Sequence, residues 1–187
     1  MDENYKHDVA ISFARADRSI ALCIYLALKL KTPESEAYYY PNKQAEMIGR
    51  NLKNELKEIY RHKSKYVILI VSKDYVNKNN EFVQTEINAF MPRYLMEKSV
   101  YIIPIIVDGT DVKKVHEELE GITTFAWDYN PEKLATLIHE LLCNLERKSD
   151  ELPIAEGEKQ SDKIIINNSS FDKSPIITDG GTININY

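Results

Sequence analysis

A continuous apolar run, KYVILIV at Lys65–Val71, is the feature that most constrains how this chain can fold. Its length is that of a β-strand, far below the roughly 18–20 apolar residues that a membrane span needs. Because polar and apolar residues do not alternate within it, the strand has no side reserved for solvent. The run therefore predicts the central strand of a sheet that is covered on both faces.

The same kind of run recurs along residues 7–148, where short β-rich segments alternate with helical periods. The predicted strands are 7–13, 36–40, 65–71, 100–107 and 122–127. The predicted helices are 19–31, 45–60, 81–97, a short piece at 111–119, and a last helix with Asn130 as N-cap and Pro131 as its first residue. This alternation predicts an α/β fold, a doubly wound five-stranded parallel sheet of flavodoxin-like topology with strand order 2-1-3-4-5.

The predicted topology also locates a binding site. In that strand order the topological switch lies between the first and third strands, and ligands bind at the carboxyl ends of the strands there. The residues at those ends are SFARADR at 12–18 and SKDY at 72–75. We therefore expect a ligand crevice between these two segments.

The charge distribution limits the classes of partner. The formal net charge is −5, and residues 149–187 carry seven acidic and three basic side chains, so residues 1–148 are close to neutral. Neither part has the basic excess of a nucleic-acid-binding protein. The acidic start, MDEN, lacks the features of a secretion signal, which predicts a cytoplasmic protein. We accordingly expect neither nucleic acid nor membrane as a partner.

The cysteines and histidines give no sign of a disulfide or a metal site. Cys23 and Cys143 lie among apolar residues of predicted helices, as small buried thiols do in a reducing compartment. The four histidines have no ligand spacing among themselves or with the cysteines. No bound metal is expected.

The composition changes after Lys148. The predicted division is a domain at 1–148, a polar linker at 149–162 and a strand-forming interaction tail at 163–187. The tail contains β-rich runs at Ile164–Ile166 and at 181–187. Two short strands are not stable alone, so we expect them to pair with another copy of the chain or with a separate effector or sensor protein. An ordinary disordered terminus is the alternative.

One helix near the expected crevice carries a carboxylate on an apolar stripe. The segment Glu81–Phe90 reads EFVQTEINAF, and helical spacing places Phe82, Glu86 and Phe90 on one face. Desolvation would raise the pKa of such a carboxyl group and suit it to acid–base chemistry or to stabilising a cation. The alternative is a glutamate at the edge of the helix that reaches water. Dinucleotide-binding, P-loop and serine-hydrolase motifs are absent from the sequence.

Residues 7–145 resemble a TIR (Toll/interleukin-1 receptor) domain, and most of all the stand-alone prokaryotic members of that family. The matching stretches are HDVAISFARADR at 7–18, QAEMIGRNLKNELKEIY at 44–60, YVILIVSKDYVNK at 66–78 and EFVQTEINAF at 81–90. Enzymatic members of the family cleave NAD⁺ between nicotinamide and ribose. The resemblance implies that this chain is an NADase or ADP-ribosyl cyclase of prokaryotic antiviral defence, with NAD⁺ as its substrate and no cofactor.

The resemblance also implies which residues form the site. It places the catalytic glutamate on Glu86 and the substrate-binding residues on Phe13, Arg15, Arg18, Tyr40, Ile48, Ser72, Tyr75 and Phe82. A carboxylate suits this reaction because the departure of nicotinamide leaves an oxocarbenium-like ribose. The arginines suit the pyrophosphate, and the aromatic rings suit stacking. Tyr40 replaces an aspartate that is common in relatives, whereas Ile48 and Phe82 replace tryptophans.

Two hypotheses about function follow. The first is an enzyme whose product is ADP-ribose if water attacks the ribose, and a cyclic nucleotide if the adenine base attacks it. The second is a non-catalytic scaffold that acts through TIR–TIR self-association. The retained glutamate favours the enzyme, whereas the changed loop after the second strand favours the scaffold. For Arg15 and Arg18 the alternative role is a solvated loop with a salt bridge to Asp17. For Phe13 and Phe82 it is core packing.

Overall fold

The computed structural model describes residues 5–97 and 100–150 of the 187-residue chain. All of these residues belong to one compact unit, Met1–Leu152. The predicted interaction tail at 163–187, and the predicted linker beyond residue 150, lie outside the described residues. The strand-forming role of the tail therefore stays a prediction.

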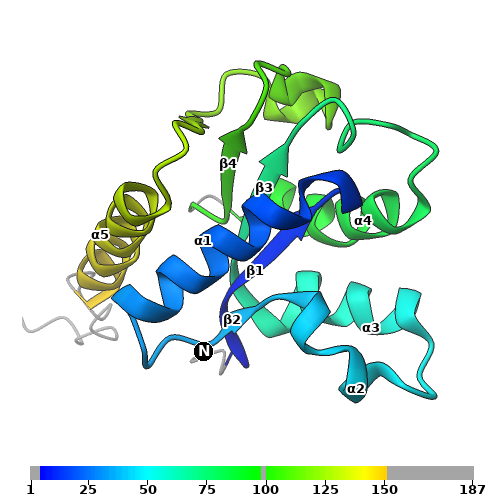
Figure 1. The fold of residues 1–187 in the computed structure, drawn as a ribbon, viewed down its shortest axis with the longest axis horizontal. Coiled ribbons are helices and arrows are strands. Elements are labelled where there is room, and N and C mark those ends of the chain that lie inside the picture. Colours follow the sequence, from blue (N-terminus) through cyan, green and yellow to red (C-terminus); the bar gives the residue numbers. More distant parts are fainter. Residues whose placement is uncertain (1–4, 98–99, 151–187) are drawn as a thin grey trace, which may run out of the picture. The chain divides into compact units, whose positions relative to one another are not determined.

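Parallel strands form a sheet at the centre of this unit (Figure 1). In chain order they are β1 (His7–Phe13), β2 (Ala37–Tyr38), β3 (Ser64–Val71), β4 (Ile102–Ile106) and β5 (Phe125–Ala126). Their spatial order, β2-β1-β3-β4-β5, confirms the order predicted from the sequence. The pairing of β1 with β3 runs from His7 opposite Ser64 to Phe13 opposite Ile70. Nearly every residue of β3 is buried, which confirms it as the central strand.

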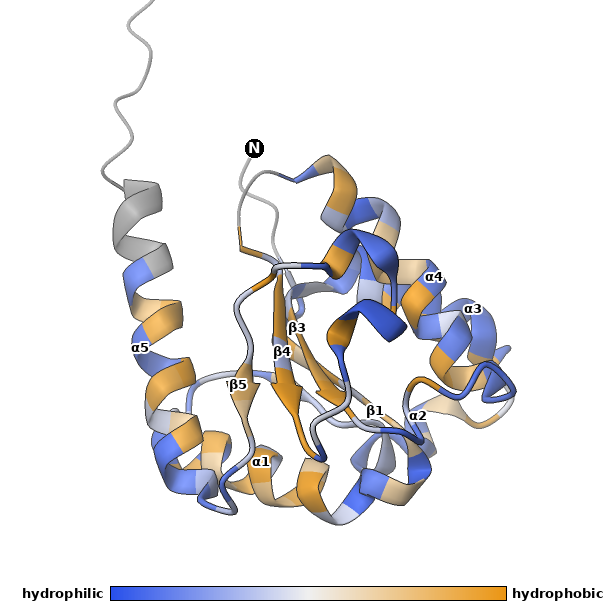
Figure 2. Ribbon diagram, turned by 90° about the horizontal axis from the view of Figure 1, so that it is seen from above, coloured by the Kyte–Doolittle hydropathy of each residue, from blue (hydrophilic) through white to orange (hydrophobic). Residues whose placement is uncertain are grey.

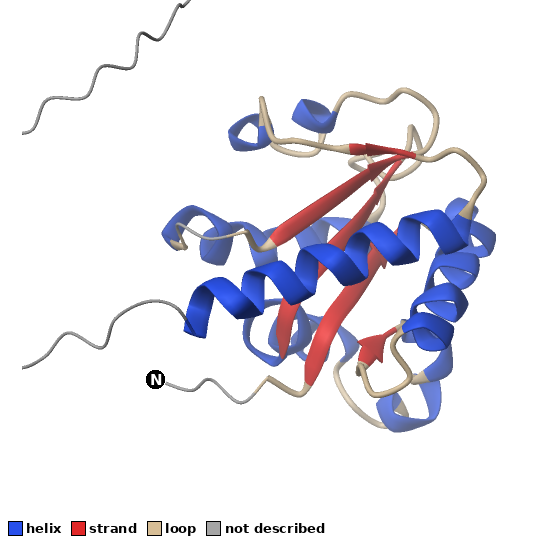
Figure 3. Ribbon diagram, turned by 90° about the vertical axis from the view of Figure 1, so that its left-hand side faces the viewer, coloured by secondary structure: helices blue, strands red, loops and turns tan. Residues whose placement is uncertain are grey.

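Helices cover both faces of the sheet. They are α1 (Arg18–Lys31), α2 (Gln44–Met47), α3 (Leu52–Glu58), α4 (Glu81–Met96) and α5 (Pro131–Asp150). The pair α1 and α5 packs over one face, and the pair α3 and α4 packs over the other (Figure 2). In a view from the side of α5, that helix crosses in front of the strands (Figure 3). The predicted three-layer α/β arrangement is thus confirmed.

Alternation along β1 divides its side chains between the two layers. Val9 and Ile11 pack in the core with α1 and α5, whereas Ala10 packs in the core with α3 and α4. Ser12 also points to this second layer, because its hydroxyl bonds to Glu86 of α4. The small side chains on this side of β1 leave space for larger groups from other elements.

The region predicted as one helix, 45–60, is broken, so that prediction was wrong. α2 ends at Met47, and Gly49 adopts a φ of 78°, a conformation that glycine reaches without strain. Asn51 then caps α3, because its side chain accepts a hydrogen bond of 3.2 Å from the backbone N–H of Asn54. The chain leaves α3 through a π-helical turn at Ile59–Lys63. The turn at Gly49 and the N-cap at Asn51 separate two helices, although the apolar period continues across them.

Several elements are shorter than the sequence predicted. β2, β4 and β5 cover 37–38, 102–106 and 125–126, where 36–40, 100–107 and 122–127 were expected. β2 and β5 are the outer strands of the sheet, and only two residues of each pair with a neighbour. The predicted helix at 111–119 is instead two short 3-10 turns. Position in the sheet, which a local apolar run does not encode, decides how far an outer strand extends.

The signals at the last helix were interpreted correctly. α5 begins at Pro131, and the side chain of Asn130 accepts a hydrogen bond of 3.0 Å from the backbone N–H of Lys133. The helix continues to Asp150, two residues beyond the predicted domain boundary at Lys148. None of the described helices is both long enough and apolar enough to cross a membrane.

The two cysteines are free thiols, but their predicted burial was wrong. Cys23 is exposed on α1, and Cys143 is half-buried on α5. Ala21 and Ile24 of α1 are fully buried against the sheet. Since neighbouring residues point in different directions on a helix, the burial of these two turns Cys23 outward.

Candidate active site

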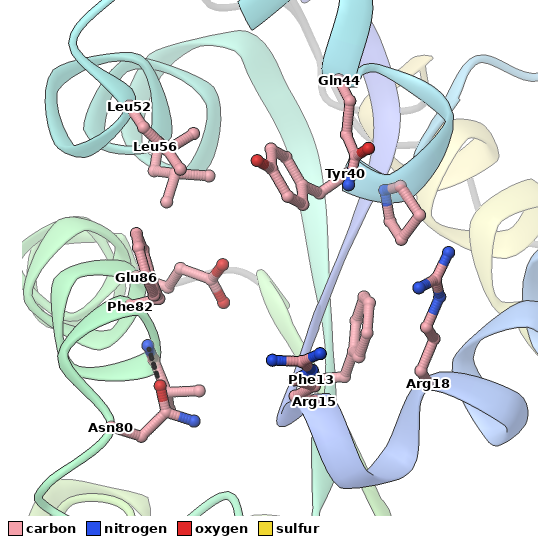
Figure 4. Close-up of a pocket in the computed structure, with 12 residues that line it drawn as sticks. Phe13, Arg15, Arg18, Tyr40, Gln44, Leu52, Leu56, Asn80, Phe82 and Glu86 are labelled. Atoms are coloured by element: carbon pink, nitrogen blue, oxygen red, sulfur yellow. Dashed lines mark hydrogen bonds between the residues drawn. The ribbon is translucent and has the colours of Figure 1, made fainter.

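A pocket of about 310 Å³ opens between the carboxyl end of β1 and the first turns of α4 (Figure 4). Its lining comes from the end of β1, the start of α1, the segment after β2, and helices α3 and α4. The lining residues are Phe13, Arg15, Arg18, Tyr40, Pro41, Gln44, Leu52, Leu56, Asn80, Phe82, Val83 and Glu86. This volume is at the lower end of the range for small-molecule sites. The pocket lies at the end of the first strand, as predicted, but residues 72–75, which were expected to form its other wall, do not line it; residues of α3 and α4 do.

Glu86 directs its carboxylate into this pocket from α4 (Figure 4). Asn80 caps the helix by accepting a hydrogen bond of 3.4 Å from the backbone N–H of Val83, and this start places Phe82 and Glu86 one turn apart. Glu86 is only 8% exposed, which contradicts the alternative of a glutamate that reaches water. Its Oε2 accepts a hydrogen bond of 2.5 Å from the hydroxyl of Ser12.

The surroundings of Glu86 favour its protonated form. Burial raises the pKa of Glu86 to about 8, while the hydroxyls of Ser12 and Tyr60 act in the opposite direction. A carboxyl group with this pKa exchanges its proton near neutral pH, which suits a general base or an electrostatic stabiliser of a cation. The single carboxylate of the pocket lining is thus poised between its two charge states.

Aromatic and aliphatic side chains form the walls around Glu86. The ring of Phe13 stacks on Tyr39 with centroids 5.5 Å apart, and Phe13 also lines the pocket. Phe82 is 52% exposed, so core packing does not explain it. Tyr40 comes from the segment after β2 and faces the pocket from the side opposite Phe13 (Figure 4). These rings offer flat apolar surface to a planar ligand group.

Two arginines border the pocket on the side of α1. Arg15 and Arg18 are exposed, and among the described residues neither forms an ion pair. Asp17, between them in sequence, is buried and accepts a hydrogen bond of 2.6 Å from the hydroxyl of Ser72. The alternative of a salt bridge between Asp17 and an arginine is therefore wrong. The guanidinium groups are available for an anionic ligand group.

Not all of the predicted site residues line the pocket. Ile48 is 83% exposed in the loop between α2 and α3 and lies outside the lining. Ser72 and Tyr75 are buried in the turn after β3 and also lie outside it. Tyr75 is connected to the site from behind, because its hydroxyl lies 2.6 Å from Ser12 Oγ. The other six predicted residues all line the pocket.

Several residues of the lining were not singled out from the sequence. Leu52 and Leu56 carry the apolar period of α3, which the sequence analysis did not connect with the site. Asn80 precedes a predicted helix, so an N-cap could have been inferred there. Gln44 lies within the segment 39–49, where the resemblance to the TIR family places part of the pocket, although the sequence did not single out this residue. Ser12 stood at a strand end without any signal for its partner, Glu86, 74 residues away.

Comparison with known proteins identifies the family. A family model described as TIR domain matches residues 9–140, so the chain belongs to the TIR domain family. The chain is also similar to the 3' cyclic ADP-D-ribose synthase AaTIR of Aquimarina amphilecti, with 33% identity over 144 residues. The match covers 75% of this chain and 41% of that protein, so this chain spans less than half of the relative's length.

Solved structures agree with the family assignment at the level of the fold. A metazoan TIR-STING receptor from C. gigas matches with a TM-score of 0.54 and 17% identity, covering 74% of this chain and 41% of that one. The TIR domain of the Toll-related receptor TRR-2 from Hydra magnipapillata matches with a TM-score of 0.50 and 20% identity, covering 75% and 98%. At these identities the likeness supports the fold alone.

Proposed function

We propose that this chain is an enzyme that cleaves NAD⁺ at the bond between nicotinamide and ribose. The observation that carries the proposal is the buried carboxyl group of Glu86, directed into a pocket with aromatic walls and, at its edge, two arginines that form no ion pair with any described residue. The similarity to a 3' cyclic ADP-D-ribose synthase supports the same chemistry. NAD⁺ is the substrate in this proposal, and the reaction requires no bound cofactor or metal.

The residues of the pocket suit the steps of this reaction. The bond between the nicotinamide nitrogen and ribose C1′ breaks, nicotinamide leaves with the electron pair, and positive charge develops on the ribose. The ionised carboxylate of Glu86 stabilises that charge and can hold ribose hydroxyls. Arg15 and Arg18 pair with the pyrophosphate. Phe13 or Phe82 stacks on a ring of the substrate.

The acceptor decides the product. Water attacking C1′ gives ADP-ribose and releases one proton, whereas attack by a group of the same nucleotide closes a ring. The relative's name refers to a 3' cyclic product, which supports cyclisation as one outcome for this chain. We place the activity in prokaryotic antiviral defence in the cytoplasm, as depletion of NAD⁺ or production of a nucleotide signal, on the basis of the resemblance to stand-alone prokaryotic TIR proteins.

A scaffold that acts only through TIR–TIR contacts is the second candidate. The observation that favours it is Ile48, a large apolar side chain that is 83% exposed beside Gly49 in the loop between α2 and α3. An exposed apolar residue on a loop suits contact with another protein surface. Self-association is compatible with the enzyme as well, because Ile48 lies outside the pocket lining.

Incubation of the purified full chain with NAD⁺ tests the proposal. The protein is used at high concentration, and the products are separated by chromatography against nicotinamide, ADP-ribose and cyclic standards. Glu86→Gln is the inactive variant, and Glu81→Gln is its matched control, because Glu81 lies on the same helix outside the pocket and pairs with Lys53 at 2.9 Å. Release of nicotinamide by the wild type and by Glu81→Gln supports the enzyme. No release at any concentration leaves the scaffold as the better hypothesis.

A further inference from the structure

The geometry behind the pocket points to a role for two residues outside its lining. We propose that Ser12, held in place by Tyr75, is a positioning residue that fixes the orientation of Glu86 and favours its ionised form during catalysis. We call Tyr75, Ser12 and Glu86 the hydroxyl relay. The inference rests on the proposed function, since it assumes that the carboxylate of Glu86 acts on the substrate.

The relay is short, continuous and shielded from water. The hydroxyl of Tyr75 lies 2.6 Å from Ser12 Oγ, which in turn lies 2.5 Å from Glu86 Oε2. Ser12 and Tyr75 are completely buried, and Glu86 is 8% exposed. The distance between Ser12 and Glu86 is that of a hydrogen bond from a hydroxyl to a charged oxygen.

Counting hydrogens gives the relay a direction. A serine hydroxyl has a single hydrogen, so when Ser12 donates to the carboxylate of Glu86, Tyr75 must donate to Ser12. If Glu86 is protonated on Oε2 and donates to Ser12, the hydrogen of Ser12 must turn away from the carboxyl group. Ser12 Oγ can then accept from both Glu86 and Tyr75, but the hydrogen of Ser12 itself has lost Glu86 as its acceptor. A hydrogen bond from a hydroxyl is stronger when the accepting oxygen is charged, so donation by Ser12 at 2.5 Å favours the ionised carboxylate of Glu86.

A second pair of hydrogen bonds fixes Tyr75 itself. The backbone N–H of Tyr75 donates to Ser72 Oγ at 3.1 Å, and the hydroxyl of Ser72 donates to Asp17 Oδ2 at 2.6 Å. Asp17 lies between the two arginines of the pocket edge, so the turn after β3 is tied to the segment that carries them. Ser72 and Tyr75 therefore act from behind the pocket, which is why neither lines it.

The other titratable groups around Glu86 do not stabilise its ionised form in place of the Ser12 hydroxyl. The titratable side chains that face Glu86 or share its pocket are Tyr38, Tyr60, Tyr75, Tyr40, Arg15 and Arg18. Burial raises the pKa of Tyr38, Tyr60 and Tyr75 above the ordinary value, so these three are neutral near pH 7. Removal of Ser12 takes away a donor to the carboxylate and changes none of these charges.

The kinetic test removes one hydroxyl at a time in the full chain. Ser12→Ala deletes the donor to Glu86, and Tyr75→Phe deletes the outer hydroxyl. Thr32→Val is the control, because Thr32 is a buried hydroxyl that bonds to the carbonyl of Leu28 far from the site. We expect the acid limb of kcat against pH to move up by about one to two pH units in Ser12→Ala, less in Tyr75→Phe and not at all in Thr32→Val. KM should change less than about twofold, because the relay does not touch the substrate.

A second measurement does not depend on activity. The carboxyl groups of glutamate are labelled with ¹³C, the signal of Glu86 is assigned by its loss in Glu86→Gln, and its titration is followed by NMR. Ser12→Ala should shift that titration to higher pH. If neither the titration nor the pH profile moves in folded Ser12→Ala, the inference is wrong. If activity falls equally at every pH while the titration is unchanged, Ser12 is only structural and the inference is also wrong. If the wild type does not cleave NAD⁺, the proposed function fails, and the titration still decides whether Ser12 controls the charge of Glu86.

Discussion

The two faces of the sheet differ in chemistry although they share the same strands. The face under α1 and α5 is mainly aliphatic, with Ile11, Ile24, Ile68 and Ile70 fully buried. The face under α3 and α4 holds small β1 residues, buried tyrosines and the carboxyl group of Glu86. The first face is filled mainly by closely packed aliphatic side chains, whereas the second also buries polar groups. A binding pocket opens on the second face and at its edge.

This contrast has an energetic consequence. A buried carboxyl group with a raised pKa destabilises the folded state once the unfolded state has released its proton. Because burial raises the pKa of Glu86 to about 8, that cost develops between about pH 4 and pH 8 and persists above it. The aliphatic face supplies the stability that offsets it. The following predictions test this division of roles, starting with the largest effect.

Glu86→Gln should change activity and stability in opposite directions. Loss of the charge should lower NAD⁺ cleavage by about 10²–10³-fold or more, as for other groups that stabilise charge in a transition state. The same change should raise the free energy of unfolding by about 3–5 kcal/mol at pH 8, because no carboxylate is then buried. Thermal melts at pH 5 and pH 8 check this, with a clearly larger gain in Tm at pH 8. A Glu86→Gln variant that cleaves NAD⁺ normally would remove Glu86 from the mechanism.

Ile24→Ala should show the reverse pattern on the other face. Ile24 of α1 is fully buried in the aliphatic core, so the truncation should cost about 2–5 kcal/mol of unfolding free energy through lost contacts and a cavity. Of the residues that line the pocket, only Phe13 packs against this core, so kcat measured well below the melting temperature should stay within about twofold of wild type. Urea unfolding followed by circular dichroism gives the stability. A large fall in kcat of the folded variant would show that the faces are not independent.

The pH dependence of the cleavage rate should show the ionisation of Glu86, the carboxyl group on the polar face. If ionised Glu86 is required, kcat/KM should rise about tenfold per pH unit on the acid side and level off near pH 8. The limb of kcat should lie at lower pH, because the positive nicotinamide ring of bound NAD⁺ favours the carboxylate. Initial rates between pH 5.5 and 9.5 measure both limbs. A profile that is flat across this range would contradict the requirement for ionised Glu86.

Arg15→Ala and Arg18→Ala should weaken substrate binding more than turnover. A contact with the pyrophosphate exists in the ground state and in the transition state alike, so its loss should raise KM by about tenfold and change kcat little. Arg50→Ala is the control, because Arg50 is an exposed arginine outside the pocket that pairs with Glu55. Unchanged kinetics in both pocket variants would support the alternative that Arg15 and Arg18 belong to a solvated loop and do not bind substrate.

Truncation after Lys148 should have the smallest effect on the fold. Both faces of the sheet lie within the unit that ends at Leu152, so Tm should stay within a few degrees of wild type. The predicted role of residues 163–187 in interaction should instead appear as a change in mass by light scattering or in partner binding. Unfolding of the truncated chain would assign the tail to the core. Unchanged mass, partner binding and activity would mean that the tail is dispensable.

Local patterns in the sequence determined the framework of this protein. The apolar run at 65–71 predicted a central strand, the strand at 7–13 matches β1, and alternation with helices predicted the strand order. These succeed because burial on a strand or helix repeats with a fixed period along the chain. The resemblance to the TIR family selected Glu86, and helical spacing alone placed it on the face shared with Phe82.

Only the tertiary structure decided how the side chains combine. It left Ile48 outside the pocket and placed Ser72 and Tyr75 behind it. It also brought Ser12 to Glu86, which turned a serine at a strand end into the donor that opposes the raised pKa of that carboxyl group. Periodicity tells which side of an element is buried, but not which residue of another element lies opposite. That pairing depends on sheet register and helix packing, which are properties of the whole fold.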